Sequence, residues 1–246
     1  MNQARVRFYG PLNDFLVRRK REQWIEHSFD GQPSVKDVIE SLGVPHTEIE
    51  TILVNRIAVD FGYLVKDQNT IEVYPPGWQF EARPAIAVRP ATPDDRCFVL
   101  DTHLGRLAAY LRMLGFDTLY RNDYGDEELA RVSSEENRIL LTRDVGLLKR
   151  GIVQHGYFVR ETNPEKQLTE IVRYYDLLPK IEPFGRCSKC NSALEVVSKD
   201  DIKEQLPPMT TDYFDEFRRC TGCGKIYWRG SHMDRLDKVI SALRSE

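Results

Sequence analysis

Hydrophobic and polar residues alternate in the first part of the chain, as they do in half-buried strands. The alternation predicts strands over residues 5–9 and 24–29, and two further strands are predicted over 51–54 and 70–74. An amphipathic stretch between them predicts a helix that starts at Ser34 and ends at Gly43. One helix on a small mixed sheet is the plan of a β-grasp domain, which we place at residues 1–78.

The rhythm changes after residue 95 to short apolar strands that alternate with amphipathic helices. This alternation predicts an open, parallel α/β domain over residues 96–180, with strands at 97–100, 116–120, 138–142 and 157–160. Pro84, Pro90 and Pro93 interrupt the stretch before it, so residues 79–95 are predicted to be a linker. The remaining residues, 181–246, form the last predicted domain. The expected fold class is therefore α/β.

The composition is that of a folded protein, with 41% hydrophobic and 30% charged residues among 246. No apolar run approaches the ~18 residues of a membrane helix, and the N-terminal stretch lacks the apolar core of a signal peptide. We therefore expect no membrane partner and a cytoplasmic location. The net charge of −3 comes from an excess of acidic residues within 1–95. Since the rest of the chain is balanced, charge neither supports nor excludes RNA binding.

Aspartates follow the predicted strands of the α/β region. Asp101 comes after the first strand, Asp126 opens the helix after the second, and Asp144 comes after the third. Binding crevices in open α/β sheets lie beyond the carboxyl ends of the strands, so we expect these carboxylates to converge. Carboxylates suit Mg²⁺ or Mn²⁺, and such cations activate water against a phosphodiester. Asp123 and Glu127 are candidates for additional ligands.

Structural roles compete with metal binding at each of these positions. Helix capping alone explains an aspartate at position 126. A carboxylate at a strand end is an unusual packing choice, so Asp101 and Asp144 are the stronger ligand candidates. Several basic residues nearby are candidates for holding phosphate, although each is also explained as a solvated surface charge. They are Arg106, Arg112, Arg143, Lys149 and Arg150.

Four of the five cysteines form two Cys-x-x-Cys pairs separated by 29 residues. Without an export signal, such pairs indicate metal ligands rather than disulfides. Four thiolates complete the tetrahedron of a structural zinc site, which is the predicted role of Cys187, Cys190, Cys220 and Cys223. The long interval between the pairs predicts an inserted helix or loop near Pro207 and Pro208.

Basic and aromatic side chains surround these cysteines, a combination that suits single-stranded RNA, where bases stack and phosphates pair with cations. Alternatively, Tyr227 and Trp228 form the small core that a zinc ribbon otherwise lacks. Residues 230–233 are interpreted as continuous with a preceding strand. The candidate RNA-binding residues here are Arg218, Arg219, Lys225, Trp228, Arg229 and His232.

The strings DTHLGRLAAYLRMLGFDTLY, DEELARVSSEENRILLTRDVGLLKRG, RCSKCN and RCTGCGKIYWRGSH follow one another along the chain. Together they resemble the RNase family named after the C-terminal domain of the mutator-seven exoribonuclease, a branch of the PIN-like nucleases. Bacterial members with an N-terminal ubiquitin-like domain have the same order of parts. The resemblance implies a metal-dependent ribonuclease fused to a zinc ribbon, with Asp101, Asp126 and Asp144 as its acids and RNA, for example tRNA, as its partner.

The sequence departs from its relatives at two places. Many PIN-like nucleases have a fourth acid, for which only Glu161 or Asn163 stands nearby here. Ubiquitin-like sulfur carriers act through a free Gly-Gly end, whereas the segment Pro75-Pro76-Gly77-Trp78 continues into the chain. We therefore expect the β-grasp domain to dock a protein partner or to aid folding.

Two other functions are compatible with parts of this pattern. The first is a non-catalytic RNA-binding or adaptor protein, in which the zinc ribbon and the β-grasp domain act without cleavage. The second is a receiver-like phosphoacceptor domain, which also places acids at the ends of its first and third strands. A receiver needs a lysine at the end of a fifth strand, and no such strand is predicted here.

Overall fold

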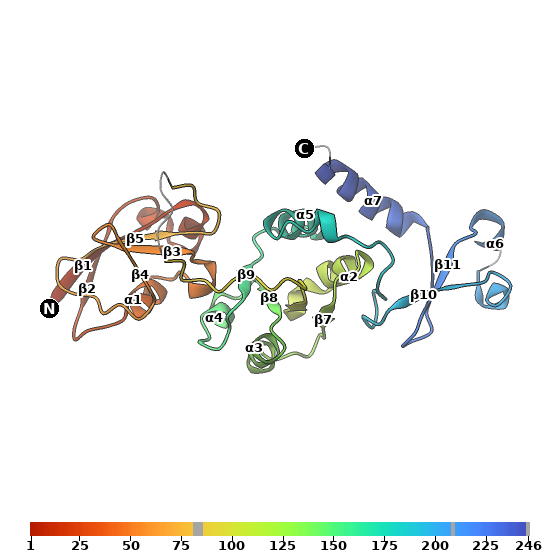
Figure 1. Cartoon of the computed structure of the whole chain (residues 1–246), viewed down its shortest axis with the longest axis horizontal. Helices are drawn as coiled ribbons and strands as arrows, with labels where there is room; N and C mark the ends of the chain where they lie inside the picture. Colours follow the sequence, from red (N-terminus) through yellow and green to blue (C-terminus); the bar gives the residue numbers. More distant parts are fainter. Residues whose placement is uncertain (81–85, 208–209, 245–246) are drawn as a thin grey trace. The chain divides into compact units, whose positions relative to one another are not determined.

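A computed structural model describes residues 1–80, 86–207 and 210–244, with the side chains of 211–212 and 231–235 left out. The described chain forms two compact units (Figure 1). The first contains residues 1–94 and 126–158, and the second contains residues 95–125 and 159–246. Each unit therefore combines segments that are far apart in the sequence.

The N-terminal part of the first unit is a mixed five-stranded sheet in the order β2-β1-β5-β3-β4. Its strands are β1 (Asn2–Phe8), β2 (Ile25–Phe29), β3 (Thr51–Val54), β4 (Ile57–Val59) and β5 (Thr70–Tyr74). Only β1 and β5 pair in parallel, and the other pairs are antiparallel. This is the ubiquitin-like arrangement that the sequence predicts. The three-residue β4 was not predicted; it follows a tight turn in which Asn55 and Arg56 both have positive φ.

Helix α1 (Val35–Ser41) is fixed at both ends by local sequence. The Ser34 hydroxyl accepts a hydrogen bond from the Asp37 backbone N–H, and the Asp37 carboxylate accepts one from the Ser34 N–H. The helix ends before Gly43, whose φ of +116° favours glycine. The apolar face of α1 joins the buried core of the sheet, which includes Val6 and Ile52.

The first unit also contains half of the α/β region. It comprises α3 (Asp126–Glu135), β8 (Ile139–Thr142), α4 (Val145–Leu148) and β9 (Gly156–Phe158). Strands β8 and β9 pair in parallel, and both helices pack against β8. All four residues of β8 are buried, as expected of a parallel strand covered on both faces.

The second unit contains the other half, with β6 (Phe98–Leu100), α2 (Gly105–Met113), β7 (Thr118–Tyr120) and α5 (Pro164–Tyr174). Strands β6 and β7 pair in parallel, and α2 packs against both β7 and α5. Asn163 caps α5 by accepting hydrogen bonds from the backbone N–H groups of Glu165 and Lys166. The predicted alternation of parallel strands and helices is confirmed, and with it the α/β class.

The cysteine-containing segment of this unit is a three-stranded antiparallel sheet of β10 (Leu194–Val197), β11 (Phe217–Cys220) and β12 (Ile226–Trp228). Between the cysteine pairs lie η6 (Lys203–Gln205) and α6 (Thr210–Tyr213), the insertion that the spacing predicts; Pro208 itself lies outside the described residues. Helix α7 (Ser231–Arg244), which was not predicted from the sequence, begins shortly after β12 ends. The apolar positions Leu236, Ile240 and Leu243 recur at helical spacing and are buried.

Short 3₁₀ helices complete the elements: η1 (Gly10–Phe15), η2 (Arg18–Lys20), η3 (His46–Glu48), η4 (Thr102–Leu104) and η5 (Leu178–Lys180). In the described chain, no helix has the length and apolar character needed to cross a membrane. The predicted linker carries no helix or strand in its described residues, and residues 81–85 of it lie outside them. The domain boundaries at 78, 95 and 180 stay predictions.

Candidate functional site

The four paired cysteines come together in the second unit. Their sulfur atoms all lie within 4.8 Å of one another. The Cys187–Cys223 and Cys190–Cys220 sulfurs are 3.6 and 3.3 Å apart, too far for the ~2.05 Å of a disulfide. Zinc with bonds of about 2.3 Å to sulfur places its ligands about 3.8 Å apart. The cluster therefore has the spacing of a four-thiolate metal site.

The turns around the sulfurs supply hydrogen-bond donors that stabilise negative charge on sulfur. The backbone N–H groups of Cys190 and Cys223 each point at the first sulfur of their own pair, at 3.4 and 3.3 Å. Hydrogen bonding with Ser192 lowers the pKa of the Cys190 thiol to about 6, whereas burial raises the pKa of Cys220. The Tyr227 hydroxyl lies 3.0 Å from the Cys187 sulfur. Buried Tyr227 is thus part of the core of this sheet, as the structural alternative predicts.

Arg112 joins the first cysteine turn to the α/β region. This side chain is 5% exposed, and its guanidinium donates to the carbonyl oxygens of Thr118, Ser188 and Lys189 at 2.8, 3.1 and 3.2 Å. Burial lowers the pKa of Arg112, but an arginine stays charged in a folded protein. Asn191 adds a second link by accepting the Thr118 N–H at 3.1 Å. Arg112 therefore organises the fold, and we leave it out of the proposed RNA contacts.

Replacing Arg112 with methionine is expected to lower the free energy of unfolding by about 2–3 kcal/mol, because buried carbonyl groups lose their donor. Urea unfolding followed by circular dichroism measures the change. The matched control is Arg131→Met, which removes an exposed arginine paired with Glu135 and should cost under about 0.5 kcal/mol. Equal losses for the two variants would contradict the structural role of Arg112.

Asp101 lies in the second unit, directly after β6, and is 8% exposed. Its Oδ1 accepts hydrogen bonds from the Thr102 N–H and hydroxyl at 2.5 and 3.1 Å, and so caps η4. The Tyr120 hydroxyl donates to the Thr102 carbonyl at 3.0 Å, which links this turn to the end of β7. Asp123, a candidate additional ligand, pairs with Arg121 at 2.9 Å, and this hydrogen bond lowers its pKa.

Asp126 and Asp144 belong to the first unit, and both are exposed. Asp126 is the first residue of α3, where its negative charge interacts favourably with the helix dipole. Asp144 caps α4, because its Oδ1 accepts the N–H groups of Gly146 and Leu147 at 2.6 and 3.3 Å. Asp101 and Asp144 thus cap the helices that follow them, a role that was considered from the sequence only for Asp126. The convergence of the three acids stays a prediction.

Residues of the ubiquitin-like part contact the segment that follows Asp144. The His46 Nδ1 lies 2.7 Å from a Glu40 oxygen, and its Nε2 lies 2.9 Å from the Val153 carbonyl oxygen. The Lys149 ammonium donates to the Glu40 carbonyl oxygen at 2.7 Å. The side chain of Lys149, a candidate for phosphate, is therefore engaged within its own unit.

The same contact continues along β9. The Phe158 N–H donates to the buried Glu48 carboxylate at 2.6 Å, and the Phe158 ring packs edge-on against Phe15 with centroids 5.3 Å apart. A Cβ atom at Gly156 would lie 2.6 Å from the Leu148 Cδ2 and 3.2 Å from the Thr47 methyl group, so only glycine fits there without displacing a neighbour. The ubiquitin-like part thus has an intramolecular partner, the segment from α4 to β9, which the sequence did not indicate.

The other candidate RNA-binding residues have varied surroundings. Arg106, Arg150 and Lys225 are exposed, and Lys225 lies over the Tyr227 ring. Half-buried side chains belong to Arg143, Arg218, Arg219 and Trp228, and the exposed Arg229 pairs with Asp237 at 3.5 Å. The side chain of His232 lies outside the described residues.

Two family models match the chain. The model of the Mut7-C RNAse domain matches residues 96–240, and that of the Mut7-C ubiquitin domain matches residues 1–81. Neither the curated proteins nor the solved structures contain a match. The first match spans more than half of the chain and includes the three aspartates and all four paired cysteines. The chain therefore belongs to the Mut7-C RNAse domain family and carries an N-terminal Mut7-C ubiquitin domain.

Proposed function

We propose that this protein is a metal-dependent ribonuclease that hydrolyses RNA phosphodiester bonds in the cytoplasm, with tRNA among its candidate substrates. The observation that carries the proposal is the Mut7-C RNAse match over residues 96–240, which includes the candidate acids. Four clustered cysteines without a disulfide also suit a reducing compartment.

The proposed acids are Asp101, Asp126 and Asp144. The side chain of Asp144 fits a cation, because Oδ1 makes both cap hydrogen bonds while Oδ2 accepts none from the described residues. Asp126 presents its carboxylate to solvent at the start of α3. These carboxylates would hold a Mg²⁺ or Mn²⁺ ion, which would supply an activated water and neutralise charge on the phosphate.

Basic side chains would position the RNA. We assign phosphate contacts to Arg106, Arg143 and Arg150, which occupy α2, the end of β8 and the end of α4. On the cysteine-containing sheet, the exposed Lys225 and the half-buried Trp228 combine a cation with an aromatic surface. The four cysteines hold a zinc ion. Its role is structural rather than catalytic, because four thiolates fill the tetrahedron and leave no position for water.

The purified protein is expected to cleave RNA only when Mg²⁺ or Mn²⁺ is present. End-labelled total tRNA and an unstructured RNA are incubated with Mn²⁺, with Mg²⁺ and with no added divalent ion, and products are resolved on a denaturing gel. Omitting the ions is preferable to a chelator, which also removes zinc. Products that form equally without either ion would rule out the proposed metal chemistry.

A second function, RNA binding without cleavage, is favoured by the cap roles of the acids. Asp101 and Asp144 each stabilise the helix that follows them, which accounts for their presence without a metal. On this alternative the protein is an adaptor, and RNA affinity measured by titration is independent of Mg²⁺ and Mn²⁺. Binding of RNA without products in any of the three conditions above would favour it.

A further inference from the structure

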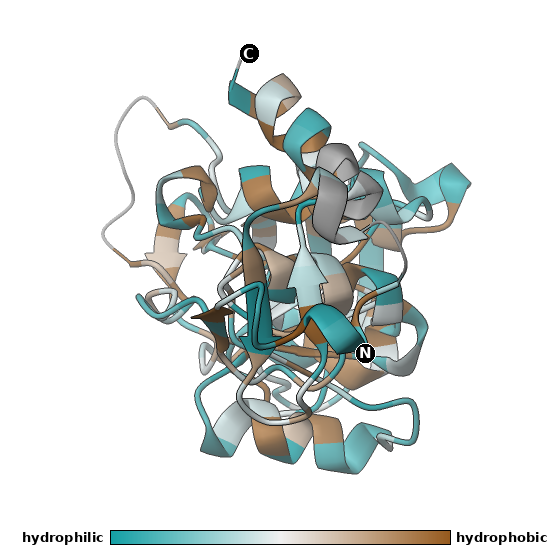
Figure 2. Cartoon of the chain, turned by 90° about the vertical axis from the view of Figure 1, so that its right-hand side faces the viewer, coloured by the Kyte–Doolittle hydropathy of each residue, from teal (hydrophilic) through white to brown (hydrophobic). Residues whose placement is uncertain are grey.

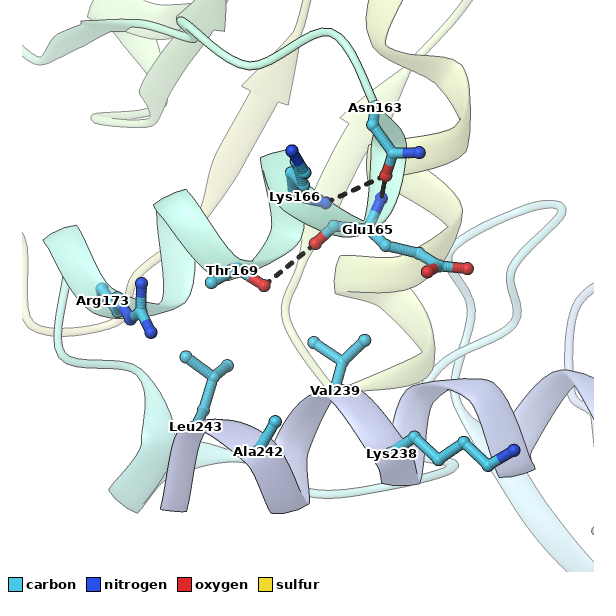
Figure 3. Close-up of a pocket in the computed structure, with 9 residues that line it drawn as sticks. All are labelled: Asn163, Glu165, Lys166, Thr169, Arg173, Lys238, Val239, Ala242 and Leu243. Atoms are coloured by element: carbon cyan, nitrogen blue, oxygen red, sulfur yellow. Dashed lines mark hydrogen bonds between the residues drawn. The ribbon is translucent and has the colours of Figure 1, made fainter. Parts of the chain in front are cut away.

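Helices α5 and α7 line an open groove of about 480 Å³ in the second unit (Figure 3). A polar stripe of α5, formed by Glu165, Thr169 and Arg173 at intervals of four residues, lines one side. The Val239 and Leu243 side chains rise from α7 toward this stripe. A polar helix face thus stands opposite an apolar one, and no residue that the structure describes fills the space between them.

Cationic side chains outnumber carboxylates among the described residues that line the groove. Its lining contains Lys166, Arg173 and Lys238, and Glu165 is the one carboxylate among the described lining residues. Lys166 and Lys238 are exposed, and neither forms an ion pair with any residue that the structure describes. The Asn163 side-chain oxygen is already engaged in capping α5. An anion in the groove would therefore be held by the cationic side chains.

Helix α7 gives the groove its amphipathic character. Hydrophobic and hydrophilic residues alternate along this helix, which ends at the C-terminus in Figure 2. Leu236 and Ile240 are buried, whereas Val239 is half-buried and Ala242 is exposed at the groove. The floor of the groove is therefore a small aliphatic surface beside cations. The volume of the groove falls in the range of about 300–1,000 Å³ that ligand pockets occupy.

We propose that the α5–α7 groove binds a single-stranded segment of RNA, with phosphates on Lys166 and Lys238 and a base on the aliphatic floor. Single-stranded RNA is the occupant that matches both surfaces, because its unpaired bases can turn toward an apolar floor while the backbone stays near cations. A duplex presents phosphates only, since its bases are stacked and paired. This inference rests on the proposed ribonuclease function and adds a binding surface separate from the candidate acids.

The test measures RNA binding by two kinds of groove variant. Lys166→Glu/Lys238→Glu reverses two charges, and Ala242→Trp fills the floor without changing charge. The probe is a fluorescein-labelled single-stranded RNA of about 12 nucleotides, titrated by anisotropy without added Mg²⁺ or Mn²⁺. The charge-matched control is Lys66→Glu/Lys203→Glu, which alters two exposed lysines outside the groove.

The charge-reversal variant is expected to raise the Kd at least about tenfold and to reduce the slope of log K against log salt by about 1.4, since each lost phosphate contact removes about 0.7. Ala242→Trp should raise the Kd with the slope unchanged. The control should stay within about twofold of the wild type, because distant exposed charges are screened.

The outcomes separate this proposal from the proposed function. If the wild type cleaves RNA and both groove variants bind the probe as tightly as the wild type does, the groove proposal is wrong and the ribonuclease proposal stands. If the wild type neither binds nor cleaves RNA, both are overturned. A wild-type dimer that dissociates in the groove variants, with RNA affinity unchanged, would assign the groove to self-association instead.

Discussion

Asp144→Asn is expected to reduce RNA cleavage at least about 100-fold while leaving the fold intact. Asparagine caps helices about as well as aspartate, so its side-chain oxygen can still accept the N–H groups of Gly146 and Leu147. The substitution removes only the negative charge, which a hard cation requires of its ligand. Initial rates on end-labelled RNA with Mn²⁺ and a urea unfolding curve, recorded on the same preparation, measure both effects.

Two further variants separate the cap role from the ligand role. Asp144→Ala removes the cap and should cost about 1 kcal/mol of stability as well as the cleavage activity. Asp60→Asn is the matched control, because the exposed Asp60 accepts the Gly62 N–H at 2.9 Å in a turn of the ubiquitin-like part. It should cleave at the wild-type rate. Full activity in Asp144→Asn would show that Asp144 is only a helix cap.

The elements of the chain could be predicted where local sequence decides them. Ser34, Asp37 and Gly43 fix α1 through a capping box and a positive-φ residue, and the structure has the helix where these signals place it. The strands of the α/β region follow from apolar runs that are buried on both faces. Shorter elements escaped, because β4 and α4 contain three and four residues, too few to show a period.

Helix α7 was missed for a different reason. Its positions Leu236, Ile240 and Leu243 carry the helical period, but no element was predicted for this segment, since residues 230–233 were interpreted only as continuous with a strand. The groove with α5 could therefore not be anticipated.

Contacts between distant segments could not be predicted from local patterns. Arg112 and Ser188 are 76 residues apart, and His46 and Val153 are 107 apart. An arginine on an amphipathic helix is usually a surface charge, so nothing in the sequence around Arg112 indicated a buried donor. Likewise, the carboxylates at the strand ends were interpreted as metal ligands. Their cap roles could not be predicted, because the hydrogen bonds of Asp101 and Asp144 depend on turns that only the structure shows.

Removing the metal from the cysteine cluster is expected to unfold more than the segment from residue 181 onward. Four thiolates without a cation repel one another, and zinc binding of about 10–16 kcal/mol is coupled to folding in such sites. The first cysteine turn also accepts hydrogen bonds from Arg112 and carries Asn191, whose side-chain oxygen accepts the Thr118 N–H. Loss of the turn therefore leaves the Arg112 guanidinium without two of its carbonyl partners. We therefore expect the loosening to spread into α2 and β7.

Hydrogen exchange with mass spectrometry measures this spread in the wild type before and after chelation, and in Cys220→Ser. Amides of residues 105–120 should exchange at least about tenfold faster in both samples, which corresponds to a loss of about 1.4 kcal/mol. The ubiquitin-like sheet provides an internal reference, because residues 2–74 form a separate core and should exchange as before. Faster exchange confined to residues 187–228 would show that Arg112 does not couple the metal site to the α/β region. Unchanged exchange throughout would show that the four cysteines hold no structural metal, since a cation that completes a tetrahedron of thiolates cannot be withdrawn without releasing the turns that it joins.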